Sequence, residues 1–239
     1  MVRGVSVISN APRLAEMAGQ IGFETVWIDV EHGTPGFVEI EHLCLATEAG
    51  GAYPTVRIAD HSRTNVLRAV EVGARIVVVP MIQTADQATE VVQHAKFPPI
   101  GRRGFNTRSR GVGYGLGASP VASFAAANER IHLFAQIETR QAVDNLQSIC
   151  AVQGLDGIFI GPGDLSVDLG KTGEFTDPEL IQLIANTISD ARQANIRAGI
   201  LAPPGPVLEA AIKAGSQLVI AGGDLTNLAP AWQSLLAKL

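Results

Sequence analysis

The sequence predicts an α/β fold, a single-domain (β/α)8 TIM barrel over residues 1–239. Short apolar runs rich in β-branched residues alternate eight times with segments whose apolar residues recur at helical spacing. Each unit averages about 30 residues, close to the usual module of such barrels, and no stretch has the composition of a linker. Because this alternation requires a parallel sheet, eight units favour a closed barrel over an open doubly wound sheet.

The first four units are marked by signals at the helix ends. Asn10 as a cap and Pro12 near the first turn open the first helix. Gly50-Gly51 end the second helix and Gly73 closes the third. We predict strands at residues 5–8, 25–30, 53–58 and 75–81, and helices at residues 10–21, 36–49, 61–72 and 84–96.

The second half begins with an irregular stretch, residues 97–117, which is rich in Gly and Arg and leads into a short helix at residues 120–129. The apolar run at residues 155–160 ends at Gly161-Pro162-Gly163, which predicts a tight turn and no helix before Asp164. We predict the remaining strands at residues 131–137, 155–160, 197–201 and 217–221, and helices at residues 139–151, 178–195, 206–214 and 225–239.

Composition restricts the class of protein. A hydrophobic content of 46% with 25 glycines fits a large buried core with many tight connections. The net charge of −5 argues against nucleic acid or an anionic membrane surface as a partner. No apolar run approaches a membrane span of about 18 residues, and the first ten residues lack a signal-peptide core. Cys44 and Cys150 have no metal-ligand spacing, so we expect them to pack as small apolar residues in a reducing cytoplasm.

Two carboxylates follow neighbouring predicted strands. Glu138 comes directly after the run at residues 131–137, and Asp164 comes after the run at residues 155–160. Active sites of parallel barrels lie at the carboxyl ends of the strands, and Mg²⁺ or Mn²⁺ is usually held by one or two carboxylates plus water and substrate oxygens. The pair is therefore a candidate hard-metal site. The alternative is that each carboxylate only caps the helix that follows it.

An arginine and a histidine are predicted at the same mouth. Arg57 lies at the end of the third strand, where a charge needs a partner or a ligand. His32 follows the second strand, and its alternative is an ordinary surface or core histidine. A Schiff-base enzyme needs a desolvated lysine at such a strand end, but the lysines lie elsewhere: Lys96, Lys171, Lys213 and Lys238. No glycine-rich phosphate cradle opens a helix. Metal-assisted chemistry on an oxygen-rich anion remains, with Arg57 as the cation and His32 as acid or base.

Six motifs occur in order along the predicted strands: WIDVEHG, PTVRI, the VP that ends the fourth strand, FPPIGRRG, QIET and DGIFIGPGDLSVDLG. Together they resemble the HpcH/HpaI family of metal-dependent class II pyruvate aldolases, from about residue 4 to the last helix. The resemblance implies a barrel that cleaves 4-hydroxy-2-oxo acids, such as 4-hydroxy-2-oxoheptanedioate or 2-keto-3-deoxy sugar acids, to pyruvate and an aldehyde.

The resemblance also implies roles for individual residues. Glu138 and Asp164 resemble the two protein ligands of Mg²⁺, Mn²⁺ or Co²⁺. Arg57 matches an arginine that contacts the keto oxygen, and His32 matches a histidine that promotes proton transfer during C–C cleavage. The remaining matches lie around the substrate: Gln136 near the metal, the Gly163 and Asp164 amides at the substrate carboxylate, and Leu201 in the pocket wall.

The sequence departs from the family pattern at three places. The family pairs its histidine with an aspartate on the helix after the third strand, where this chain has the longer Glu71. An aromatic lining residue is expected near the first strand, where this chain has Ser6, and we expect an altered pocket there. The loop after the fourth strand is crowded with arginines that are either solvent-exposed, in contact with another subunit, or placed to bind an anionic aldehyde: Arg102, Arg103, Arg108 and Arg110.

The last predicted helix carries an apolar stripe, and two roles are open for it. The stripe either closes the barrel within the chain or, as the resemblance implies, packs on a neighbouring subunit of a homo-oligomer, a trimer or a hexamer built from trimers; its residues are Leu228, Trp232, Leu235, Leu236 and Leu239.

Three alternatives to the aldolase remain: an oxaloacetate decarboxylase, a citrate-lyase-β or acyl-CoA-lyase type of enzyme, and a barrel that only binds a 2-oxo acid.

Overall fold

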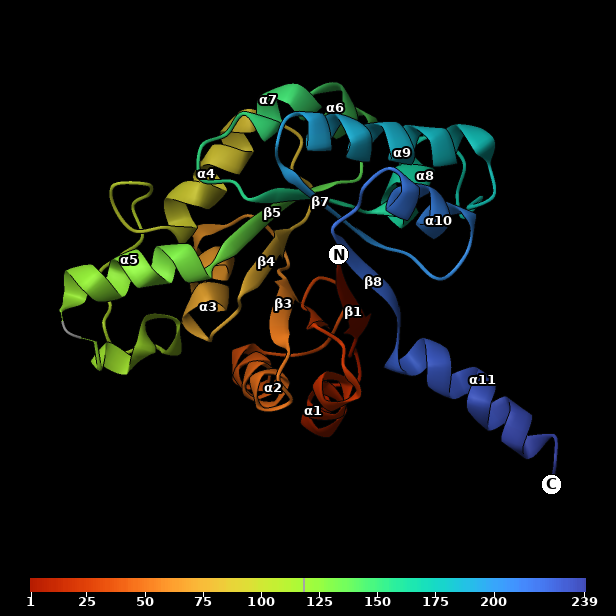
Figure 1. The fold of residues 1–239 in the computed structure, drawn as a ribbon, viewed down its shortest axis with the longest axis horizontal. Helices are drawn as coiled ribbons and strands as arrows, with labels where there is room; N and C mark the ends of the chain where they lie inside the picture. Colours follow the sequence, from red (N-terminus) through yellow and green to blue (C-terminus); the bar gives the residue numbers. More distant parts are fainter. Residues whose placement is uncertain (118) are drawn as a thin grey trace.

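The computed structural model describes residues 1–117 and 119–239, and these form a closed barrel of eight parallel strands with neighbours in chain order. Helices surround the barrel (Figure 1), so the predicted (β/α)8 architecture is confirmed. The strands are β1 (Val2–Ser6), β2 (Thr25–Asp29), β3 (Tyr53–Arg57), β4 (Ile76–Val79), β5 (His132–Ile137), β6 (Gly157–Ile160), β7 (Arg197–Leu201) and β8 (Leu218–Gly223).

All the α-helices except the last have buried residues, and the helix bounds agree with the predicted segments to within a few residues except where noted below. They are α1 (Pro12–Ile21), α2 (Phe37–Ala49), α3 (Arg63–Glu71), α4 (Ala85–Ala95), α5 (Pro120–Arg130), α6 (Arg140–Asp144), α7 (Leu146–Cys150), α8 (Pro162–Asp168), α9 (Pro178–Gln193), α10 (Pro206–Lys213) and α11 (Asp224–Leu236), with a 3-10 helix, η1, at Arg110–Gly115. None of the described helices is long and apolar enough to cross a membrane.

Strand β1 starts earlier than predicted. The chain pairs from Val2, whose N–H donates to Gln217 O at 2.7 Å, and Gly4 occupies the middle of the strand. A Cβ at Gly4 would lie 2.4 Å from the Ile220 side chain and 2.5 Å from the Thr25 side chain, so the crowded interior requires glycine there. An Arg-Gly pair does not resemble a strand in the sequence, and for that reason the prediction began at residue 5.

Two further boundaries were predicted wrongly. The single helix at residues 139–151 is two short helices, because Asn145 leaves the helical conformation and its Nδ2 donates to Gln83 O at 2.8 Å. The predicted turn before Asp164 is instead the first turn of α8, which begins at Pro162. Proline suits this position because the first helical N–H groups have no intrahelical partner.

The connection between β4 and β5 is a long excursion at the amino-terminal end of the barrel. Helix α4 runs from the carboxyl end of β4 back to this end, and α5 leads directly into β5 (Figure 1). Lys96, just after α4, connects this segment to α5, because its buried ammonium donates a hydrogen bond to Asn128 O at 2.7 Å and lies 3.5 Å from Asp156. The excursion therefore lies at the end opposite to the carboxyl ends of the strands.

Helix α11 leaves the barrel and points away from it (Figure 1). None of its residues is buried, and its apolar stripe faces outward, with Trp232 66% and Leu236 72% exposed. Within the described chain the stripe therefore does not close the barrel. Beside the start of α11, an apolar cavity of about 230 Å³ remains between β1 and α1, lined in part by Leu14, Met17 and Ile21.

Candidate active site

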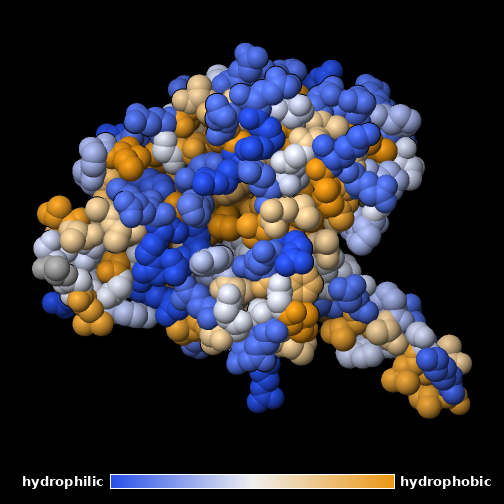
Figure 2. Space-filling model, in the orientation of Figure 1, coloured by the Kyte–Doolittle hydropathy of each residue, from blue (hydrophilic) through white to orange (hydrophobic). Residues whose placement is uncertain are grey.

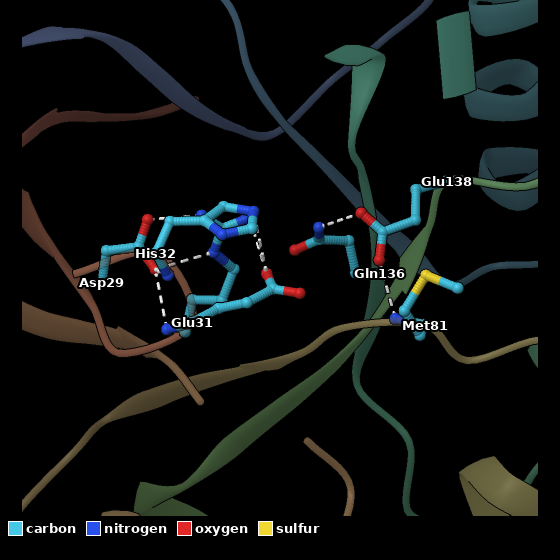
Figure 3. A network of polar contacts seen from close by, with 7 residues as sticks. Asp29, Glu31, His32, Met81, Gln136 and Glu138 are labelled. Carbon is cyan, nitrogen blue, oxygen red and sulfur yellow. Dashed lines mark hydrogen bonds and ion pairs between the residues drawn. The ribbon is translucent and has the colours of Figure 1, made fainter. Parts of the chain in front are cut away.

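Polar side chains meet at the carboxyl ends of β2, β3 and β5, and Figure 3 shows those of Asp29, Gln136 and Glu138. They lie above an aromatic floor. Inward-facing positions along the strands carry first Trp27 and Phe159, whose rings stack with centroids 4.8 Å apart. One step further along the strands, the side chains become polar: Asp29, Arg57, Gln136 and Glu138. The apolar floor thus excludes water from beneath the polar layer.

Glu138 is the most buried carboxylate of this layer, with 1% of its surface exposed. Its Oε1 accepts the Met81 N–H at 2.7 Å, and its Oε2 accepts from the Gln136 side-chain amide. Burial raises the pKa of Glu138, and these two hydrogen bonds oppose the rise only in part. A cation at this carboxylate would offset the cost of ionising it.

Gly161 allows Glu138 to lie close against β6. A Cβ at this position would lie 2.6 Å from Glu138 Oε2 and 2.9 Å from Glu138 Cβ. We expect Gly161→Ala to displace the carboxylate and to weaken Mn²⁺ binding about 10- to 100-fold, the range seen when groups that orient metal ligands are changed. Titration of Mn²⁺ by calorimetry measures this effect. Gly104→Ala, where the nearest atom would be Arg63 Nη2 at 3.4 Å, is the control. Equal affinity in both variants would contradict the expectation.

Arg57 is held by two carboxylates and is only 11% exposed. Its Nε donates to Asp29 Oδ1 at 3.0 Å, and its Nη2 pairs with Asp29 Oδ2, so the contact is bidentate. Its Nη1 lies 2.9 Å from Glu31 Oε2, and the guanidinium carbon lies 5.4 Å from the centre of the Trp27 ring. The carboxylates raise the pKa of Arg57 against the opposing effect of burial, so the guanidinium is a fixed positive charge.

His32 lies in the turn after β2, with its side chain 66% exposed. Asp29 Oδ1 accepts the N–H groups of Glu31 at 3.1 Å and of His32 at 3.2 Å, which fixes the turn. The imidazole Nε2 lies 4.0 Å from Glu31 Oε2. Figure 3 shows Asp29, Glu31 and His32 on one side of the site, with Gln136 and Glu138 facing them from the other.

Asp164 and Gly163 occupy the exposed first turn of α8, and the field of Asp164 contributes to the raised pKa of Glu138. Leu201 ends β7 beside them. Gly163 and Leu201 both line a cavity of about 260 Å³, whose other walls are mostly apolar and include Phe175, Pro203 and Val207. The first turn of α8 therefore joins the acidic pair to an apolar pocket.

Glu71 lies far from this site within the chain. It is the last residue of α3, a helix that runs from the carboxyl end of β3 toward the amino-terminal end of the barrel, and eight residues of helix span about 12 Å. Its carboxylate contacts the excursion instead, with Asn106 Nδ2 at 2.9 Å and Arg103 Nη2 at 3.7 Å. The structure therefore does not bring Glu71 and His32 of one chain together.

The arginine-rich loop lies at the same far end. Arg103 is buried against Glu71 and the Phe97 ring, and burial lowers its pKa to about 10. Arg110 pairs with Glu48 at the end of α2. Within one chain, the arginines of this loop do not line the mouth that holds Glu138. Of the three alternatives for these arginines, binding of an anionic aldehyde therefore finds no support from the single chain.

Two carboxylates to which the sequence analysis gave no role complete the site. Asp29 and Glu31 are the partners of Arg57, and their spacing of two places both on the inward side near the end of β2. Ser6 lies in register with Trp27 on the neighbouring strand, and its buried Oγ has no hydrogen-bond partner among the described residues. Trp27 is only 1% exposed and belongs to the aromatic floor, so the altered pocket expected at Ser6 stays a prediction.

The donor set fits a hard divalent cation. The described residues contain no group of three or more His, Cys, Asp and Glu placed to hold a metal ion. Glu138 and Asp164 would contribute two carboxylate oxygens, which suits an ion that completes its shell with water and substrate oxygens. Gln136 Oε1 is buried without a partner among the described residues, so the site retains an unused oxygen beside Glu138.

The fold and the site define a class of protein, a parallel-barrel enzyme built for an oxygen-rich anion. The chain belongs to the HpcH/HpaI aldolase/citrate lyase family, which matches residues 4–231. It is 34% identical over 226 residues to 2-keto-3-deoxy-L-rhamnonate aldolase of Klebsiella pneumoniae, covering 92% of this chain and 82% of the relative. It is 32% identical over 225 residues to hydroxypyruvate/pyruvate aldolase of Roseobacter denitrificans, covering 94% and 87%.

A solved structure supports the same assignment. The crystal structure of an HpcH/HpaI aldolase from Desulfitobacterium hafniense superposes with a TM-score of 0.91 at 28% identity, covering 99% of this chain and 92% of the other. The family membership predicted from the six motifs is thus confirmed.

Proposed function

We propose that this protein is a metal-dependent aldolase that reversibly cleaves a 4-hydroxy-2-oxo acid to pyruvate and an aldehyde. The observation that carries the proposal is the buried Glu138, whose negative charge acts on the fixed cation Arg57, in a chain whose relatives are named as aldolases. The family and these names support dependence on a divalent metal. Mg²⁺, Mn²⁺ and Co²⁺ are the candidate ions, and Glu138 and Asp164 are their proposed ligands.

In this proposal, different residues of the chain bind the substrate, stabilise the enolate and accept the proton. A divalent ion, when bound, withdraws electrons from the 2-oxo acid. The Gly163 and Asp164 amides at the start of α8 hold the substrate carboxylate, and Leu201 packs beside it. Arg57 stabilises the negative charge that develops on the keto oxygen as the C3–C4 bond breaks. His32 accepts the C4 hydroxyl proton, directly or through water, and the electron pair of the broken bond forms the enolate.

Glu71 can join this machinery only from a second copy of the chain. Its place at the far end of α3 separates it from His32 of its own chain. We therefore propose that any pairing between these two residues is made across a subunit boundary. A mixed oligomer of Glu71→Gln and His32→Ala chains tests this, because some of its sites combine an intact His32 with an intact Glu71 from the other chain. Activity no higher than that of the two parent variants would contradict the proposal.

The first experiment is pyruvate release from racemic 4-hydroxy-2-oxo acids, coupled to lactate dehydrogenase, with and without chelator. We expect release that the chelator abolishes and that Mn²⁺ or Mg²⁺ restores. The apolar cavity beside Leu201 favours acids with an uncharged chain over those with a distal carboxylate. Turnover of oxaloacetate alone would indicate a decarboxylase on the same site. Failure with both would favour a citrate-lyase type of enzyme or a barrel that only binds 2-oxo acids.

We also propose a homo-oligomer, a trimer or a hexamer, in which α11 packs on a neighbouring subunit. The exposed stripe of α11 and the apolar cavity between β1 and α1 support this arrangement. Figure 2 shows apolar surface gathered at the tip of the arm that α11 forms. A second chain could bury both surfaces at once. Within a cytoplasmic enzyme, such a contact would bring the carboxyl-terminal helix of one barrel against another.

The oligomer is tested by charges on the stripe. We expect the double variant Trp232→Asp and Leu236→Asp to shift the mass in solution toward the monomer, because exposed aspartates do not bury in an apolar groove. Light scattering after size-exclusion chromatography measures the mass. Gln233→Asp places a charge on the same helix beside the stripe and serves as the control. An unchanged mass in the double variant would contradict the arrangement.

A further inference from the structure

We propose that Glu31 is a positioning residue that holds His32 in place beside Arg57 within one chain. The inference rests on the proposed aldolase function. It assigns to Glu31 a role at the histidine that the family resemblance gives to Glu71.

Glu31 is the carboxylate that lies between the two groups. Its Oε2 is 2.9 Å from Arg57 Nη1 and 4.0 Å from His32 Nε2, and its side chain is 17% exposed. The contact with Arg57 lacks the alignment of a hydrogen bond, so Oε2 has no hydrogen-bond partner among the described residues and can still accept one. A modest rotation of the exposed imidazole would make His32 that donor.

The turn after β2 makes this placement rigid. Asp29 accepts the main-chain N–H groups of both Glu31 and His32 and also binds Arg57 through two side-chain contacts. Asp29 therefore fixes the backbone of the turn, and Glu31 supplies the carboxylate that faces the reacting groups. Without Glu31, Arg57 keeps its bidentate partner, whereas His32 loses the carboxylate nearest to it. The two functional groups should thus respond differently to loss of Glu31.

The chemistry separates these responses. Cleavage of a 4-hydroxy-2-oxo acid needs Arg57 at the developing enolate and His32 at the C4 hydroxyl proton. In decarboxylation of oxaloacetate, the C3–C4 bond breaks and CO₂ leaves. The electron pair of the broken bond forms the same enolate, and there is no hydroxyl proton to remove. A residue that positions His32 affects only the first reaction. A residue that positions Arg57 alone affects both.

The experiment compares Glu31→Gln with the parent protein in both reactions at saturating Mn²⁺. We expect the kcat of pyruvate release from a 4-hydroxy-2-oxo acid to fall about 10- to 100-fold, the loss that misplacement of a reacting group by about 1 Å produces. Decarboxylation of oxaloacetate should fall by no more than about threefold, because Asp29 still holds Arg57. Glu31→Asp should recover part of the lost cleavage rate. Glu39→Gln, on the exposed side of α2, is the matched control.

A second readout does not depend on turnover. In protein labelled with ¹⁵N-histidine, the ring signals of His32 should move in Glu31→Gln and stay in place in Glu39→Gln. Unchanged cleavage and unchanged His32 signals in Glu31→Gln would overturn the inference, as would equal losses in both reactions. An inactive parent protein would instead contradict the proposed function, so the two failures are distinguishable.

Discussion

Replacement of Glu138 by glutamine is expected to abolish metal-dependent pyruvate release and to remove the stabilisation that Mn²⁺ gives the protein. The parent protein at a Mn²⁺ concentration of 100 Kd should gain about 2.7 kcal/mol, which corresponds to a rise in Tm of roughly 5–10 °C for a chain of this length. Differential scanning calorimetry with and without Mn²⁺ measures both variants. Asp144→Asn, at an exposed position on α6, is the control. A parental Mn²⁺ shift in Glu138→Gln would show that this carboxylate is not a ligand.

The raised pKa of Glu138 adds a dependence on pH to this prediction. Because burial raises its pKa in the folded protein, the folded state binds this proton more tightly than the unfolded chain does. In metal-free protein, the contribution of Glu138 to stability is therefore largest at low pH and is lost as the pH rises through the raised pKa. Mn²⁺ needs the ionised carboxylate, so its affinity should fall as the pH drops below that value.

The second large effect is expected at Arg57. Arg57→Gln should lower kcat about 10²- to 10³-fold, the usual cost of removing one donor from a developing oxyanion. The same change leaves Asp29 without the guanidinium that holds it, and breaking a buried ion pair costs about 3–5 kcal/mol of unfolding free energy. Steady-state kinetics at saturating Mn²⁺ and urea unfolding measure the two losses separately.

A double variant distinguishes the two consequences of losing Arg57. Asp29→Asn combined with Arg57→Gln removes both charges, so we expect it to regain much of the stability and none of the rate. Arg13→Gln, on the exposed part of α1, is the control for removal of an arginine. If the double variant recovered activity together with stability, Arg57 would be structural and its assignment to the keto oxygen would be wrong.

The barrel and the strand-end positions of the site could be predicted because both follow from local patterns. An apolar run that stops at a charged residue places that residue at the mouth of a parallel barrel, which located Arg57 and Glu138. The partners of Arg57 could not be predicted in this way. They depend on the register that sets Asp29 of β2 beside Arg57 of β3. The register between two strands cannot be predicted from the sequence of either strand alone.

The place of Glu71 at the far end of α3 could have been predicted from the sequence, but the family resemblance paired this residue with His32 without regard to that place. A helix of nine residues after β3 carries its last residue to the opposite end of the barrel, and the length of the predicted segment already implied this. The same reasoning applies to Arg103, which follows a helix that returns from the mouth. The helix that begins at Pro162 had a usable signal as well, because proline is favoured at the first helical position.

The outward course of α11 has a kinetic consequence. Helices α1 to α10 have buried residues within the single chain, but in the proposed oligomer the apolar cavity beside α1 would be filled only when a second molecule arrives. The last stage of maturation would then be second order, with a half-time inversely proportional to protein concentration. A freshly made chain at low abundance would wait with its apolar arm exposed, so the timing of enzyme production would depend on how many copies are made together.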